Sequence, residues 1–134
     1  NMSQLLHEVD VPIKKATFAL GCFWGPDSLF GAMKGVIRTR VGYCGGAKAD
    51  PTYKSIYHQK YRLQQHSWLV KAVGLNSGPQ LTSSHLAARL NGYVVGFGGI
   101  KQFESEIDRL GLDEKVADYV RKLVVKYEGR GLTC

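Results

Sequence analysis

A cysteine between an apolar stretch and a helix-like segment is the residue of this chain best suited to nucleophilic chemistry. Cys22 follows the partly β-favouring stretch 15–20 and precedes 26–33, where apolar residues repeat at helical spacing. This pattern predicts a strand-to-helix turn at Cys22. Backbone N–H groups at a helix N-terminus stabilise a thiolate and lower the pKa of a cysteine below its ordinary value of about 8.5. The alternative is a small cysteine packed in a core, because cysteine is among the most buried residue types.

The neighbours of Cys22 favour a reactive thiol. Gly21 and Gly25 flank it, and Phe23 and Trp24 follow it directly, where their rings could wall a pocket. Sulfur and methyl groups pack on aromatic rings with about 0.3 to 1.5 kcal/mol per contact. Ordinary core packing is the alternative for both aromatic residues.

The elements that must position this thiol come next in the chain. Residues 35–42 have the β-branched content and partial alternation of a strand, and the glycine-rich loop after them leads to Tyr53. From residue 57 onward the pattern is helical with glycine breaks. One helix is expected to end near Gly74, a second spans 81–90, a third spans 100–110, and Asp113 is a suitable N-cap for the last.

Length and composition set the class of protein. The chain has 134 residues, which is about one ordinary domain, with 44% hydrophobic residues, a net charge of +7, three cysteines and four histidines. The basic residues are scattered, so a solvated basic surface is favoured over a nucleic-acid track. No apolar run is long enough to cross a bilayer, and the histidines and cysteines have no zinc-ligand spacing. We therefore expect no cofactor, metal, nucleic acid or membrane, and a cytoplasmic protein.

Three motifs in order carry a resemblance to a known family. The run 21–25 (GCFWG), the run 41–46 (VGYCGG) and the run 51–53 (PTY) together resemble the class A peptide methionine sulfoxide reductases. Residues 57–61 (YHQKY) are similar to a motif near the end of that family's catalytic domain. The remainder, which closes on Cys134, resembles the helical C-terminal extension of some animal members.

The resemblance implies a fold, an activity and residue roles. The expected fold is α+β, a mixed sheet with surrounding helices in a partial reductase domain (1–61), followed by a helical extension (62–134). Cys22 would attack the sulfur of methionine S-sulfoxide in peptides and proteins, Tyr53 would hydrogen-bond the oxygen, and Phe23 and Trp24 would hold the S-methyl group. Cys134 would then form a disulfide with Cys22, which thioredoxin or a similar dithiol would reduce.

One rival and one weaker assignment stay open. Cys44 competes with Cys134 as the resolving thiol, and it could equally be a small packing residue. His58 matches a motif near the family's active site, but a structural histidine is the simpler interpretation. Asp27 is the acid nearest to Cys22 in the chain; in the first turn of a helix it is expected to be ionised and not to donate a proton.

The chain departs from the family in one respect. Only three residues separate Tyr53 from Tyr57, where the family has a long stretch of strands and helices that includes its general-acid glutamate. Two hypotheses follow. The chain is an active reductase whose sequence here omits a segment, or it is a shortened, weakly active or inactive relative that acts in redox sensing or binding.

Overall fold

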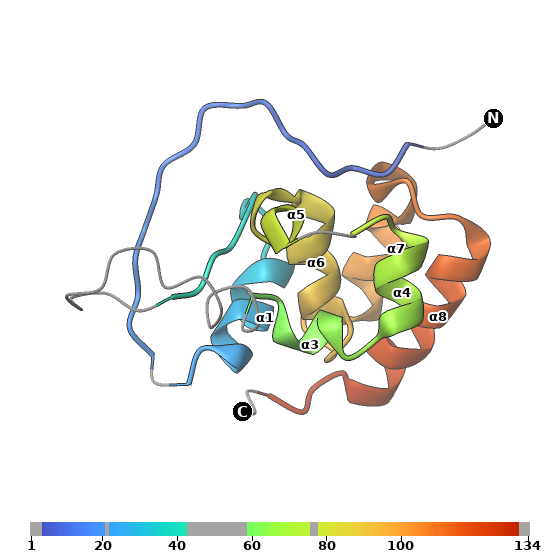
Figure 1. Cartoon of the computed structure of the whole chain (residues 1–134). Coiled ribbons are helices and arrows are strands. Elements are labelled where there is room, and N and C mark those ends of the chain that lie inside the picture. The colour runs from blue at the N-terminus through green and yellow to red at the C-terminus, as the bar shows by residue number, and fades with distance from the viewer. Residues whose placement is uncertain (1–3, 21, 43–58, 76–77, 132–134) are drawn as a thin grey trace.

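A wholly buried helix, α6 (His85–Tyr93), lies at the centre of the structure, with other helices packed around it (Figure 1). The computed structural model describes residues 4–20, 22–42, 59–75 and 78–131. The helices that surround α6 are α1 (Trp24–Ala32), α3 (Tyr61–Gln64), α4 (Ser67–Ala72), α5 (Gly78–Ser83), α7 (Gly99–Leu110) and α8 (Glu114–Tyr127). Of these, α1, α3, α5, α7 and α8 contact α6.

The last two helices confirm the predictions made for them. Helix α7 ends at Gly111, whose φ of 78° is the left-handed conformation that glycine adopts readily. Asp113 is the N-cap of α8, and its carboxylate accepts a hydrogen bond from the N–H of Val116 at 2.9 Å. Both helices present one apolar face to the core, as their spacing predicts.

The two earlier helices are each divided in the structure. Instead of one helix ending near Gly74, the chain forms α3 and α4, separated by Gln65 and His66. The predicted helix over 81–90 becomes α5 and α6, because Ser84 adopts an extended conformation and its hydroxyl accepts from the N–H of Ala87 at 3.0 Å. The apolar repeat continues unchanged across such a break, because the side chains on both sides still face the core.

The predicted α+β fold with a mixed sheet is wrong for the described residues, which contain helices and no strand. A strand needs a neighbouring strand to bond its backbone groups. Residues 36–41 bond side chains instead. Arg89 and His85 of α6 bond the carbonyls of Val36 and Ile37. Lys60 and Gln59, in the turn before α3, bond Thr39 and Val41. Residues 11–20 are exposed and run outside the helices on the way to α1 (Figure 1).

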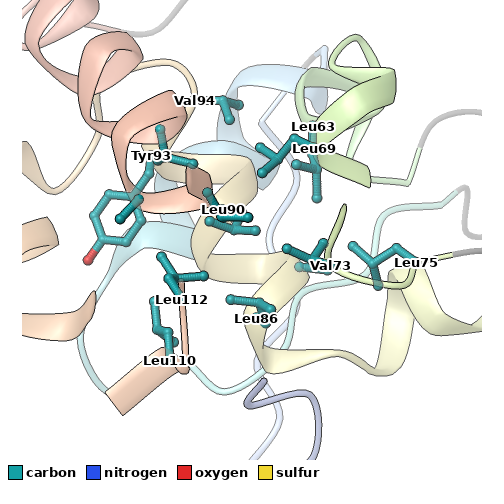
Figure 2. Packing of buried hydrophobic residues seen from close by; sticks show 14 of the residues in the cluster. Leu63, Leu69, Val73, Leu75, Leu86, Leu90, Tyr93, Val94, Leu110 and Leu112 are labelled. Carbon is teal, nitrogen blue, oxygen red and sulfur yellow. The ribbon is translucent and has the colours of Figure 1, made fainter. Parts of the chain in front are cut away.

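The hydrophobic core lies mainly in the second half of the chain. Leucines of α3, α4 and α6 meet in it (Figure 2). The ring of Tyr93 packs edge-on against Phe103, with 5.0 Å between centroids. The N-terminal segment joins this core: the N–H of Leu6 donates to the carbonyl of Leu110, and the carbonyl of Leu6 accepts from Leu86. The division of the chain near residue 61 into two domains stays a prediction.

Helices α1 and α6 approach each other closely through two glycines. A Cβ atom on Gly31 would lie 2.1 Å from the carbonyl oxygen of Ala88, and one on Gly92 would lie 2.4 Å from the Cβ of Ala32. Neither glycine is therefore replaceable by a larger residue without a shift of one helix. Among the described residues, no helix is both long and apolar enough to cross a membrane.

Gly31→Ala tests this packing. Although alanine favours a helix, its methyl group would overlap backbone of α6, so we expect the free energy of unfolding to fall by about 1 to 3 kcal/mol. Denaturant unfolding measures the effect. Gly42→Ala is the matched control, since a Cβ there has no atom within 4 Å. Equal stability of the two variants would contradict the close approach.

Candidate active site

Cys22 lies at the N-terminal end of α1, as its neighbours in the sequence suggest. It is exposed, and it directly precedes Phe23, the N-cap residue of the helix. The first turn of α1 is closed by the bond from the Asp27 N–H to the Phe23 carbonyl at 3.0 Å. The sulfur is therefore accessible to a substrate, and the N-terminal end of the helix dipole favours a negative charge close by. The strand predicted before Cys22 is absent, but the helix after it is present.

An aromatic stack stands beside the thiol. The rings of Trp24 and Tyr61 are 3.8 Å apart between centroids and inclined by 9°, so they are in close parallel contact. Tyr61 is the first residue of α3, and both residues are half-buried. Phe23 is half-buried as well. This stack brings together one residue of the motif at 21–25, Trp24, and one of the motif at 57–61, Tyr61.

A buried ion pair sets the position of α3 against α1. The Asp27 carboxylate accepts from the N–H of Lys60 at 2.9 Å and from the hydroxyl of Thr39 at 2.6 Å, and it lies 3.8 Å from the Lys60 ammonium. That ammonium also donates to the Thr39 carbonyl at 2.6 Å. Burial lowers the pKa of Lys60, whereas the charge of Asp27 raises it. Lys60 has a φ of 50°, an uncommon conformation for a residue other than glycine.

These bonds assign Asp27 a structural role. Both of its oxygens bond groups of the protein, the Thr39 hydroxyl and the Lys60 N–H, and the side chain is buried, so it is poorly placed to donate a proton to a substrate. Sequence reasoning missed Lys60 and Gln59 as members of the site. The sequence gives no local signal for them, since a lysine and a glutamine beside two tyrosines are typical of a surface.

Several predicted site residues lie outside the described residues. They are Tyr53, Cys134, Cys44 and His58. The structure therefore brings together only Cys22, Phe23 and Trp24 of the predicted site, and it adds Tyr61, Asp27 and Lys60 to their surroundings. No cluster of three metal-ligating side chains occurs in the part of the chain that the structure describes.

Two family models and several known proteins match the sequence of this chain. Residues 14–73 match the family described as peptide methionine sulfoxide reductase. Residues 74–125 match the helical domain of selenoprotein methionine sulfoxide reductase A. The peptide methionine sulfoxide reductase of Drosophila melanogaster is 30% identical, with 96% of this chain and 87% of the fly protein aligned. The chain belongs to the peptide methionine sulfoxide reductases.

Two further relatives of this family match different shares of the chain. The reductase of Pelagibacter ubique is 33% identical over 88% of this chain and 83% of its own length. That of Methanococcoides burtonii is 54% identical, but over 44 residues, which is 33% of this chain and 29% of the relative. The prediction of a peptide methionine sulfoxide reductase is confirmed.

The alignment with the fly reductase also bears on the shortened spacing in this chain. It extends over 217 residues, although this chain has 134. It must therefore pass over residues of the fly protein that have no counterpart here. This agrees with the expectation that part of the family's domain is absent from this sequence.

Asp27→Asn tests the buried ion pair of this reductase. It leaves the Lys60 ammonium without its anion, and breaking such a pair costs about 3 to 5 kcal/mol of unfolding free energy. Loss of the Asp27 charge also lowers the pKa of Lys60 further. Between the lowered pKa of Lys60 in the folded protein and its ordinary value of 10.5, the unfolded chain binds more protons than the folded chain. The free energy of unfolding therefore rises with pH in this range. In the variant this rise begins at a lower pH than in the wild type.

Denaturant unfolding from neutral to alkaline pH measures both effects. Asp118→Asn is the control, because Asp118 forms an exposed pair with Arg121, and its stability is expected to follow the wild-type pH profile. Parallel pH profiles of stability for Asp27→Asn and the wild type would show that the pKa of Lys60 does not depend on the Asp27 charge.

Proposed function

We propose that Cys22 is the nucleophile that reduces methionine S-sulfoxide in peptides and proteins. The observation that carries the proposal is the exposed thiol at the N-terminal end of α1, beside the stacked Trp24 and Tyr61. The Cys22 thiolate attacks the sulfoxide sulfur. The oxygen takes up one proton and passes to the cysteine, which becomes a sulfenic acid, and methionine leaves with its sulfur reduced by two electrons.

A second thiol completes the cycle. Cys134 attacks the Cys22 sulfenic acid, water leaves, and a disulfide forms. A thioredoxin-like dithiol then reduces this disulfide by exchange and is itself oxidised. Cys44 is the rival for the resolving step. A dithiol reductant of this kind and an odd number of cysteines both suit a reducing compartment, so we place the protein in the cytoplasm.

The aromatic residues supply substrate contacts in this proposal. Phe23 and Trp24 hold the S-methyl group of the substrate, and Tyr53 donates a hydrogen bond to the sulfoxide oxygen as it gains negative charge. The stack on Tyr61 supports this role for Trp24, because it fixes the plane of the indole ring.

Cysteine substitutions test the cycle. Cys22→Ser is expected to abolish methionine formation with any reductant. Cys134→Ser is expected to form one methionine per enzyme without reductant and to lose turnover with thioredoxin, while dithiothreitol still supports turnover. Chromatography of a dabsylated methionine sulfoxide peptide measures the product. If Cys44→Ser shows this behaviour and Cys134→Ser does not, the resolving role belongs to Cys44.

Substitution of Trp24 tests the substrate contacts separately. In Trp24→Leu the stack on Tyr61 is lost together with the flat surface for the methyl group, so we expect KM to rise about three- to tenfold. Trp68→Leu is the matched control, since Trp68 is an exposed indole on α4. A KM equal to that of the wild type in Trp24→Leu would remove Trp24 from the substrate site.

The length of the alignment with the fly reductase favours a second candidate function. A chain that lacks the family's general acid is expected to be slower by about 10² to 10⁴-fold. It would then serve as a redox sensor, in which peroxide converts Cys22 to a sulfenic acid without turnover of the sulfoxide. Trapping of the sulfenic acid by dimedone, in a protein that forms no methionine with dithiothreitol, would favour the sensor over the reductase.

A further inference from the structure

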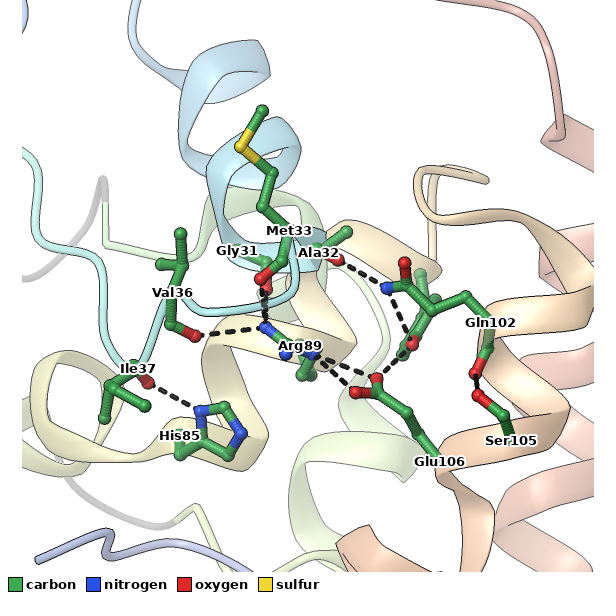
Figure 3. A network of polar contacts seen from close by, with 11 residues as sticks. Gly31, Ala32, Met33, Val36, Ile37, His85, Arg89, Gln102, Ser105 and Glu106 are labelled. Atoms are coloured by element: carbon green, nitrogen blue, oxygen red, sulfur yellow. Dashed lines mark hydrogen bonds and ion pairs between the residues drawn. The ribbon is translucent and has the colours of Figure 1, made fainter. Parts of the chain in front are cut away.

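A buried arginine of α6 contacts the end of α1 opposite to Cys22. Arg89 is 2% exposed, and its Nη1 donates to the carbonyl oxygens of Gly31 at 3.1 Å, Met33 at 2.6 Å and Val36 at 3.1 Å. Figure 3 shows the guanidinium between these carbonyls and helix α7. One side chain of the helical extension thus bonds three backbone groups in the segment that carries the thiol.

These bonds satisfy the C-terminal end of α1. The last carbonyls of a helix have no partners within it, and they form the negative end of its dipole. The last turn of α1 contains no basic residue of its own. The positive charge comes instead from Arg89, and Gln102 of α7 donates to the next carbonyl, that of Ala32. The extension therefore supplies the C-terminal cap that the sequence of α1 lacks.

The guanidinium is held from its other side by an anion. Its Nε donates to the Glu106 carboxylate at 2.9 and 3.2 Å, and Glu106 is 4% exposed. The Tyr93 hydroxyl donates to the same carboxylate. Burial and this hydrogen bond raise the pKa of Tyr93, so it stays protonated and remains a donor. A buried polar network whose members are all bonded fixes a single arrangement.

We propose that Arg89 is a positioning residue for the reductase reaction, which acts by holding the C-terminal end of α1 so that Cys22 and Trp24 are fixed at the other end. The inference rests on the proposed role of Cys22. Helix α1 has nine residues, which at 1.5 Å per residue is about 13 Å, so it transmits a displacement of one end to the other with little bending. The close approach at Gly31 and Gly92 brings the backbones of α1 and α6 into direct contact, so a shift of one helix requires a shift of the other.

A role in stability alone makes a different prediction. If Arg89 only stabilises the fold, variants that stay folded at the assay temperature will react at Cys22 and turn over substrate as the wild type does. If Arg89 positions α1, a folded variant will react more slowly. A misplacement of about 1 Å at a reacting group can lower a rate by about 10²-fold.

The test uses the full chain, with Arg89→Lys and Arg89→Met compared with Arg121→Met. Arg121 is the matched control, because it also pairs with a glutamate of α7, Glu104 at 2.9 Å. Unlike Arg89 it is not fully buried, and its printed bonds go to Glu104 and Asp118 instead of to the end of α1. Two readouts are taken below the unfolding transition of each variant. They are kcat and KM for a methionine sulfoxide peptide with dithiothreitol, and the rate of Cys22 alkylation by iodoacetamide with Cys44 and Cys134 replaced by serine.

We expect Arg89→Met to lower kcat by about ten- to a hundredfold and to slow alkylation several-fold, with Arg89→Lys in between and Arg121→Met unchanged. Wild-type kcat and alkylation in folded Arg89→Met would overturn the inference. Should the Arg89 variants not fold, Gln102→Leu is the substitute, because it removes the bond to the Ala32 carbonyl and one to the Tyr93 hydroxyl but leaves Arg89 in place. It is expected to give a smaller loss of kcat in the same direction, and an unchanged kcat would overturn the inference. If the wild type forms no methionine, the proposed function fails, and the alkylation rates alone decide the role of Arg89.

Discussion

The contact between α1 and α6 is the constraint on which the rest of this structure depends. The fully buried positions of helix α1 are small or polar, whereas its large apolar residues, Trp24, Leu29 and Phe30, are only half-buried. What attaches it to the protein is the backbone approach at Gly31 and Gly92, together with the carbonyl bonds of Arg89. The thiol segment is therefore held by close backbone packing and by charge, and less by hydrophobic area. Such an attachment tolerates little change in side-chain size.

The helical extension could be predicted from the sequence almost in full. The apolar repeats of 100–110 and 114–127 and the caps at Gly111 and Asp113 are local signals, and local signals determine these helices. The breaks at Gln65–His66 and at Ser84 were not predicted, because they alter the backbone without altering the apolar repeat. The sheet was the main error. It was expected from the family, and a strand forms only where another strand is available to bond it.

The candidate site could be predicted at Cys22, since glycines, aromatic residues and a helix start surround it in the sequence. The ion pair of Asp27 and Lys60 could not, because the two residues are 33 positions apart and each alone is typical of a solvated surface. The stack of Trp24 on Tyr61 depends on that pair, since Lys60 directly precedes Tyr61. Long-range polar contacts of this kind leave no periodic pattern in a sequence.

The residues that hold α1 in place lie far from it in the sequence, and this affects the order in which the protein can fold during synthesis. The bond from Arg89 to Gly31 joins residues 58 positions apart, and the N-terminal His7 bonds Ser84, 77 positions away. During translation the thiol segment emerges well before α6, so neither α1 nor the N-terminal segment has its partner while the first half of the chain is made. Contacts of such long range also slow folding, because the loop must close before they form. The segment that carries Cys22 therefore takes its final position only after α6 has been made.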